Sequence, residues 1–119
     1  MGMAKIEPES GSEEIEMLMG QARKASDLLK ALSHETRLLI LCLLTEGEKS
    51  VSELEEIMSM PQAAVSQQLA RLRFDRLVNT RRDGRVIYYS IANDEVTHLI
   101  ETLYDFFCKP LREGKTSGD

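Results

Sequence analysis

The sequence predicts one mainly α-helical domain with a small β-hairpin, and three patterns support this. Residues 51–58 and 62–74 place apolar side chains at helical spacing on either side of a tight break. Residues 77–91 then alternate like two strands around an Asp-Gly turn. Apolar stripes at helical spacing lie toward both ends of the chain. A helix-turn-helix followed by a two-stranded ribbon is a winged helix-turn-helix, here in the order α-α-(β)-α-α-β-β-α.

The length of 119 residues suits a single domain with a modest core, which a partner chain often completes. No apolar run approaches the ~18 residues of a membrane span, and the N-terminus lacks a signal-peptide core. We therefore expect a cytoplasmic protein with no membrane partner. Composition predicts a disordered tail at residues 1–11, a DNA-binding and dimerisation domain at 12–108, and a flexible C-terminal tail at 109–119.

The first helix is expected from Ser12, as its N-cap, to about Ala31. Acidic residues follow Ser12 in the first turn, where the helix dipole favours them. The apolar residues near one stripe are Ile15, Leu18, Met19, Ala22, Leu28, Leu29 and Leu32. A small winged domain cannot cover so much apolar surface by itself, so we expect a partner chain to cover it. Packing on the chain's own core is the alternative.

The next helix is expected to begin after Ser33 as its N-cap, with His34 assisting the cap. Residues 37–44 are apolar nearly all round, which predicts the central buried helix of the domain. Gly47 is expected to end this region. Residues 50 and 51 then predict a short bridge strand, and Ser52 is expected to cap the first helix of the hairpin.

The last helix is expected to begin near Asn93 or Asp94 and to run to about Cys108. Its strong apolar stripe consists of Val96, Leu99, Ile100, Leu103, Phe106 and Phe107. Helical segments at both chain ends, flanking a winged unit, are typical of a symmetric homodimer built from the termini. We therefore expect the chain to pair with itself through its first and last helices.

The second helix of the hairpin is the candidate reading helix, because such a helix can lie in the major groove of DNA. Small and amide side chains near its start can reach base edges, and arginines further along can hold phosphates. Arginines at the hairpin tip are placed to enter a minor groove. An ordinary helical hairpin and a solvated turn are the alternatives. The candidate DNA-binding residues are Gln62, Ala63, Ser66, Gln67, Arg71, Arg73, Arg82 and Arg85.

The net charge of −5 is unevenly distributed. Residues 60–90 contain six arginines and two aspartates, a net charge of +4, whereas the remainder holds nine basic and eighteen acidic groups, a net charge of −9. The positive charge is thus concentrated on the proposed reading unit, as contact with double-stranded DNA requires. Because the rest of the chain is acidic and opposes indiscriminate binding, we expect specific, salt-sensitive affinity.

Several segments together make the chain recognisable. The most specific are LSHETRLLIL, SVSELEE, VSQQLARLR and GRVIYYSI. With them, residues 25–108 closely resemble the ArsR/SmtB family of winged-helix repressors. The resemblance implies a homodimer that sits on a palindromic operator and dissociates from it when an inducer binds. It also implies that Gln62, Ser66 and Gln67 are reading positions and that Arg85 lies in the wing.

Two positions depart from the family pattern. Gln68 stands where the family often has histidine, and Arg76 stands where it usually has glycine. If Arg76 adopts a left-handed backbone, the strain costs on the order of 1 kcal/mol. Neither departure threatens the expected fold.

The metal sites of many relatives lack their ligands in this sequence. A thiolate site would need cysteines within residues 50–56, where there are none. The zinc site of the last helix would need aspartate and histidines at positions that here carry Asn93, Glu95, Phe106 and Lys109. His98 with Glu95 or Glu101 would bind a metal only weakly, and a solvent-facing histidine is the more common situation. We therefore expect no metal and no cofactor.

Cys42 and Cys108 are the remaining candidates for sensing. They lie 66 positions apart, without zinc-ribbon or CxxC spacing, and a structural disulfide is not expected in the cytosol. By itself, Cys42 suits a small core position. The placement of the pair resembles the sulfide- and persulfide-responsive branch of the family, which includes the biofilm and sulfide-oxidation repressors. That resemblance implies that reactive sulfur species link Cys42 to Cys108 through a di- to tetrasulfide bridge and that DNA is then released.

The sequence therefore predicts a transcriptional repressor that is not an enzyme. Two alternatives keep its DNA-binding function. The switch can be peroxide or a thiolate-bound metal, or the protein can be an activator or counter-silencer that displaces another DNA-binding protein. A thiol oxidoreductase is disfavoured because the chain has no CxxC motif, no resolving thiol on a βαβ unit and no Gly-rich loop.

Overall fold

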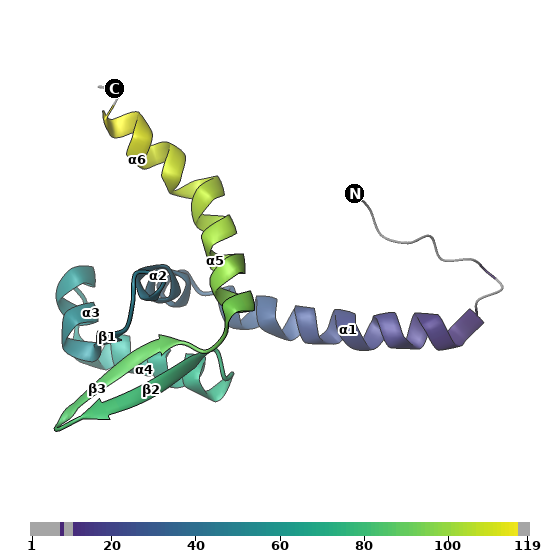
Figure 1. Cartoon of the computed structure of the whole chain (residues 1–119), viewed down its shortest axis with the longest axis horizontal. Coiled ribbons are helices and arrows are strands. Elements are labelled where there is room, and N and C mark those ends of the chain that lie inside the picture. The colour runs from purple at the N-terminus through teal and green to yellow at the C-terminus, as the bar shows by residue number, and fades with distance from the viewer. Residues whose placement is uncertain (1–7, 9–10, 117–119) are drawn as a thin grey trace. The chain divides into compact units, whose positions relative to one another are not determined.

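The computed structural model describes residue 8 and residues 11–116, in two units at residues 1–30 and 31–119 that are treated separately. Figure 1 shows the elements in chain order. They are α1 (Gly11–Leu32), α2 (Glu35–Leu44), β1 (Lys49–Ser50), α3 (Val51–Met58), α4 (Gln62–Phe74), β2 (Val78–Asp83), β3 (Val86–Ile91), α5 (Asp94–Phe107) and α6 (Lys109–Thr116). This order confirms the predicted winged helix-turn-helix. No described helix is long and apolar enough to cross a membrane.

The three strands form one antiparallel sheet in the order β1-β3-β2. The β2–β3 register runs from the pair Val78 and Ile91 to the pair Asp83 and Val86. The turn is therefore Gly84 and Arg85, one residue later than the predicted Asp-Gly turn. Gly84 has a φ of 65°, a left-handed conformation that glycine adopts without steric cost. In Figure 1 the hairpin tip projects beyond the neighbouring helices of its unit.

The core of the winged unit packs against one side of α2, and because Leu39 on this helix is 45% accessible, the predicted all-round burial is only partly observed. This helix packs against both α4 and α5, and it also contacts β3. The buried apolar side chains are Ala31, Leu32, Ile40, Leu41, Leu44, Leu54, Val65, Leu69, Leu72, Leu77, Val78, Val96 and Ile100. Full burial of one such large side chain contributes roughly 1.5–3 kcal/mol, so this cluster fixes the positions of the helices that surround it.

Helix α1 begins at Gly11, so Ser12 lies in its first turn and the prediction of Ser12 as the N-cap is wrong. Acidic residues occupy the first turn as expected. Much of the predicted apolar stripe is exposed: Ile15, Leu18, Met19 and Leu29 are 44–61% accessible. The predicted disordered tail at residues 1–11 lies outside the described residues except for residues 8 and 11.

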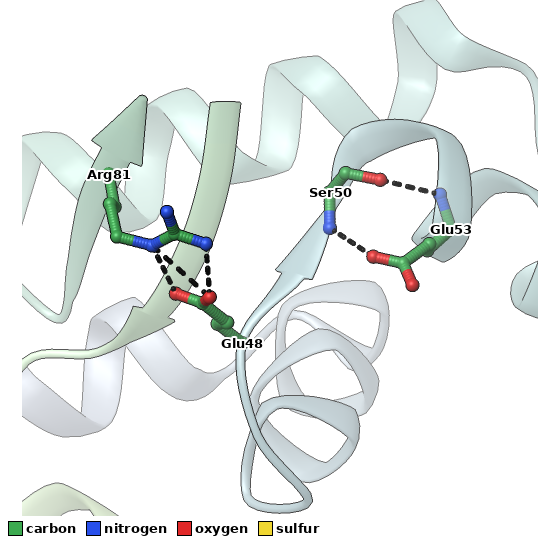
Figure 2. A network of polar contacts seen from close by, with 4 residues as sticks. All are labelled: Glu48, Ser50, Glu53 and Arg81. Carbon is green, nitrogen blue, oxygen red and sulfur yellow. Dashed lines mark hydrogen bonds and ion pairs between the residues drawn. The ribbon is translucent and has the colours of Figure 1, made fainter. Parts of the chain in front are cut away.

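Two predicted caps lie at neighbouring residues instead. His34, not Ser33, is the N-cap of α2, because its Nδ1 accepts the backbone N–H of Thr36 at 3.1 Å. Ser50, not Ser52, caps α3. Its hydroxyl accepts the N–H of Glu53 at 3.1 Å, and the Glu53 carboxylate accepts the N–H of Ser50 at 2.8 Å, as Figure 2 shows. This reciprocal capping box satisfies two backbone donors at the start of the helix-turn-helix.

Asn93 caps α5, as predicted, by accepting the N–H of Val96 at 2.9 Å. Beyond α5, residues Lys109–Thr116 form α6 within the segment predicted to be a flexible tail. Pro110 falls in the first turn of α6, where a proline removes no intrahelical hydrogen bond. The flexibility of this segment stays a prediction.

Candidate functional site

The reading helix α4 is held by one buried face. Val65, Leu69 and Leu72 are fully buried at the predicted helical spacing, so the opposite face is left to solvent. The predicted contact residues of α4 are on that side: Gln62, Ala63, Gln67, Arg71 and Arg73 are exposed, and Ser66 is half-buried. The preceding break is sharp, because Ser59 has a left-handed backbone with a φ of 54°.

The wing carries two predicted contact residues, and one of them lies near the start of α4. Arg82 and Arg85 are both exposed near the hairpin tip. Arg85 also lines a hollow of about 230 Å³ together with Gln62, the first residue of α4. The start of the reading helix and the wing therefore border one hollow, where an amide and a guanidinium group suit contact with bases and phosphates.

Two arginines within residues 60–90 form ion pairs with carboxylates of the chain. Arg71 donates to Asp75 at 2.8 Å, one helical turn along α4. On β2, the Nε of Arg81 donates to both carboxylate oxygens of Glu48, at 3.1 and 3.2 Å, and its guanidinium lies 4.7 Å from the ring centroid of Tyr88. Figure 2 shows this fork between the loop after α2 and the sheet. The hydrogen bond from Arg81 holds the pKa of Glu48 below its usual value.

The junction between α4 and β2 has a left-handed backbone at Arg76, where the family usually has glycine. Arg76 has a φ of 61°. Its N–H donates to the carbonyl of Arg73 at 3.0 Å, and the next N–H, of Leu77, donates to that of Leu72 at 2.9 Å. These two bonds form a Schellman motif, which usually has glycine at this position. Arg76 therefore directs the chain from the reading helix into the wing.

Arg37 connects elements in a way that no sequence pattern reveals. Its Nε donates to the carbonyl of Ala31 at 2.6 Å, and its Nη1 donates to the side chain of Gln68 at 2.9 Å. Gln68 is half-buried on α4, and it is one of the two positions that depart from the family pattern. Because the partners are separated by 31 positions in the chain, only the folded structure shows that they meet.

The two candidate sensing thiols are free and half-buried. Cys42 lies on α2, and Cys108 is the C-cap of α5, where its N–H donates to the carbonyl of Tyr104 at 2.8 Å. Burial raises the pKa of the Cys42 thiol, and the charge of a Cys108 thiolate raises that pKa further. The thiols are therefore electrostatically coupled, and Cys42 is mostly protonated at neutral pH.

A cavity of about 400 Å³ opens beside Cys42, which sequence patterns did not indicate. Its lining comes from α2 and the following turn, from the last two turns of α5, and from α6: Cys42, Thr45, Glu46, Glu101, Tyr104, Asp105 and Arg112. The Arg112 guanidinium donates to the Tyr104 hydroxyl and lies 5.9 Å from the centroid of its ring. The cavity gives small molecules a route to the Cys42 thiol.

His98 is exposed on α5, as predicted, and shares a shallow hollow with Asn93 and Glu95. Among the described residues, no group of three or more His, Cys, Asp or Glu side chains is arranged to hold a metal ion.

The fold and its basic surface define a winged helix-turn-helix DNA-binding protein. Residues 34–80 match the family described as bacterial regulatory protein, arsR family. The chain belongs to this family, and it is a DNA-binding transcriptional regulator whose relatives are regulators rather than enzymes.

Three relatives are informative. The biofilm growth-associated repressor of Agrobacterium fabrum is 44% identical over 76% of this chain and 77% of its own length. The transcriptional activator HlyU of Vibrio cholerae is 45% identical over 72% of this chain and 80% of its own, and the structure of reduced HlyU superposes with a TM-score of 0.75 at 42% identity, over 78% of this chain and 98% of that one. The repressor BigR of Xylella fastidiosa gives a TM-score of 0.71 at 41% identity, over 78% of this chain and 92% of its own.

Proposed function

We propose that this regulator represses transcription as a homodimer on a palindromic operator and releases the DNA when reactive sulfur species link Cys42 to Cys108. The observation that carries the switch is the placement of the thiols. Cys42 lines a cavity with side chains of the last two turns of α5, the helix that Cys108 caps. The similarity to two proteins named as repressors supports the direction of regulation.

DNA contact is assigned to the exposed face of α4 and to the wing. Amide side chains at the start of α4 suit base edges, because Asn and Gln pair with adenine in the major groove. The arginines suit phosphates and the minor groove. The proposed contact residues are Gln62, Ala63, Ser66, Gln67, Arg71, Arg73, Arg82 and Arg85. Arg71 must exchange its bond with Asp75 for a phosphate, so its net contribution is smaller than that of Arg73.

A second copy of the chain is the proposed cover for the apolar residues of α1 and α5. Large side chains are exposed on both helices, and Phe106 and Phe107 are 73% and 75% accessible. Burial of one phenylalanine contributes roughly 1.5–3 kcal/mol, so a paired interface has a strong driving force. Symmetric pairing would also place the reading helix of each copy on one half of a palindromic site.

The chemistry of the bridge needs no oxidant beyond the sulfur donor. The thiolate fraction of Cys42 attacks the outer sulfur of a persulfide RS–SH, forms Cys42–S–SH and releases RS⁻, which takes up a proton. The thiolate of Cys108 then attacks the inner sulfur of that persulfide, forms the disulfide and releases HS⁻. If a second donor has first converted Cys108 to its persulfide, the same attack gives a trisulfide and HS⁻. The donor's sulfane sulfur is reduced, and the protein thiols are oxidised.

The bridge can influence DNA binding through α2. This helix packs against α5 on one side and the reading helix on the other. A covalent link between α2 and the end of α5 would restrict how these helices shift, and close-packed interiors transmit such changes to their neighbours.

The test is operator affinity of the full chain, on DNA selected in vitro for binding by the reduced protein. We expect an excess of persulfide donor to weaken binding by about 5- to 150-fold, the usual range of allosteric coupling. Cys42→Ser and Cys108→Ser should bind the operator normally and ignore the donor. Release that persists in either variant would exclude the paired-thiol switch and leave the DNA-binding function intact.

A second candidate is activation by displacement of another DNA-binding protein, favoured by the similarity to a protein named as a transcriptional activator. Transcription in vitro with purified polymerase separates the two functions. A repressor lowers transcription in this minimal system, whereas a counter-silencer has no effect until the displaced protein is added.

Hydrogen peroxide serves as the comparison inducer in the operator-affinity test. If peroxide releases the DNA as well as persulfide does, general oxidant sensing would replace sulfur sensing.

A further inference from the structure

The cavity beside Cys42 has an uneven charge. Three carboxylates and one guanidinium line it, a formal charge of −2. Glu46 is neutralised in part by Lys49, whose Nζ lies 3.3 Å away, so the charge is −1 when Lys49 is included. The Arg112 guanidinium is held against the uncharged Tyr104.

The remaining two carboxylates are those of Glu101 and Asp105. They are four positions apart on α5, so they occupy adjacent turns on one face of the helix. Both are exposed, and within the described part of the chain neither has an ion-pair partner. A molecule that enters the cavity to reach Cys42 therefore meets two carboxylates that form no described ion pair, together with the single guanidinium of Arg112.

We propose that this cavity admits the sulfur donor and that Glu101 and Asp105 select it by charge, so that persulfides RS–SH with an uncharged or cationic R group are preferred over those with an anionic one. The inference rests on the proposed sulfur switch and specifies the chemical class of its inducer. The reacting atoms are the same for every donor, since a thiolate takes the outer sulfur and RS⁻ leaves. Only the charge carried by R differs.

For an illustrative separation of about 7 Å from each carboxylate, Coulomb's law in a water-like dielectric changes the encounter rate of a charged donor by about three- to tenfold. The carboxylates slow the approach of a donor with an anionic R group and speed that of a donor with a cationic one, because they attract a cation. Both effects weaken at high ionic strength, since the Debye length falls from about 10 Å at 0.1 M salt to about 3 Å at 1 M. A steric filter would show neither the reversal nor the salt dependence.

The experiment uses three donors of similar size: the persulfides of cysteamine, 2-mercaptoethanol and 3-mercaptopropionate, with cationic, neutral and anionic R groups. Bridge formation in the full-length reduced protein is followed by mass spectrometry after rapid quenching. Each variant's rate is divided by the wild-type rate for the same donor, which removes the donor's intrinsic reactivity. Glu101→Gln with Asp105→Asn is the test variant, and Glu95→Gln is the control, because Glu95 is on α5 but does not line the cavity.

In the double variant, we expect the ratio of anionic-donor rate to cationic-donor rate to rise about three- to tenfold or more, with an intermediate rise in each single variant. A change in the pKa of Cys42 would change the bridge-formation rates of all three donors by the same factor and leave this ratio constant. Glu95→Gln should leave it unchanged. The single variants provide the test if the double variant is unstable.

An unchanged ratio in a protein that still forms the bridge would overturn the charge filter and leave the sulfur switch standing. Failure of all three donors to bridge the wild-type thiols would overturn the switch itself and the filter with it. If Glu95→Gln changes the ratio of donor rates as much as the double variant does, the selectivity arises from the overall negative charge of the chain and not from the carboxylates in the cavity.

Discussion

The guanidinium of Arg37 on α2 joins the carbonyl of Ala31 to the side-chain amide of Gln68 on the reading helix, through hydrogen bonds of 2.6 and 2.9 Å. One planar cation on α2 thus bonds to two other parts of the winged unit, Ala31 and helix α4. The contact is part-buried, so water replaces it only incompletely when it is lost. Arg37 therefore adds a hydrogen bond between α2 and the reading helix to the apolar packing between these two helices.

Arg37→Lys is expected to destabilise the protein by about 1–3 kcal/mol, because one ammonium cannot reproduce a planar fork to two acceptors. The free energy of unfolding in urea measures this. Arg23→Lys makes the same change on the exposed surface of α1 and should stay within about 0.5 kcal/mol of wild type. Similar values for the two variants would mean that the fork contributes nothing to stability.

Glu48→Gln is expected to strengthen operator binding at low salt, because Arg81 on β2 would then be free to contact a phosphate. One added phosphate contact steepens the slope of log K against log salt by about 0.9. A salt titration of affinity measures the slope, with Glu95→Gln as the control for loss of one negative charge. A stronger affinity with an unchanged slope would show that Arg81 does not reach the DNA backbone.

The same ion pair predicts a pH dependence of stability. Since Arg81 lowers the pKa of Glu48 in the folded protein, the pair stabilises the fold fully above the ordinary carboxyl pKa. This stabilisation is lost as the pH falls through the lowered folded value. The difference in unfolding free energy between wild type and Glu48→Gln should therefore shrink with acidification. A constant difference would indicate that the carboxylate acts through packing and not through its charge.

Replacement of Arg76 tests the left-handed junction. Arg76→Gly should be more stable than Arg76→Ala by about 1 kcal/mol, because only glycine adopts a φ of 61° without steric cost. The alanine variant is the matched control, since it loses the same side chain but keeps Cβ. Thermal and urea unfolding give the comparison. Equal stability of the two variants would exclude strain at this residue.

The capping box predicts different costs for two neighbouring serines. Ser50→Ala should destabilise the protein by about 0.5–2 kcal/mol, because it removes the acceptor for the Glu53 N–H. Ser52→Ala should change stability by no more than about 0.5 kcal/mol, since Ser52 is an exposed residue within α3. A larger loss of stability in Ser52→Ala than in Ser50→Ala would identify Ser52 as the cap.

The elements that sequence patterns predict well are those fixed by apolar spacing. Helix α4 spans the predicted residues 62–74 because Val65, Leu69 and Leu72 repeat on one face. Caps are harder to predict, since neighbouring residues compete for the same role: His34 replaces Ser33, and Ser50 replaces Ser52.

The polar contacts of the candidate site were not predictable. Arg37 with Gln68 and Arg81 with Glu48 join residues 31 and 33 positions apart, and no local period encodes such pairs. The cavity beside Cys42 depends on how α2, α5 and α6 meet, and α6 lies in the segment that the sequence predicts to be a flexible tail. The two thiols themselves were identified from the sequence, but not the acidic groups around them.

The burial of α2 has a mechanical consequence. The side chains of Ile40, Leu41 and Leu44 are buried, and the helix contacts both α4 and α5. A helix packed in this way behaves as an incompressible spacer, because close-packed side chains cannot absorb a displacement by filling voids. Its thickness sets the separation between α5 and helix α4. Altering the volume of one buried α2 side chain would therefore shift α4 and α5 at once, although that residue lies on neither helix.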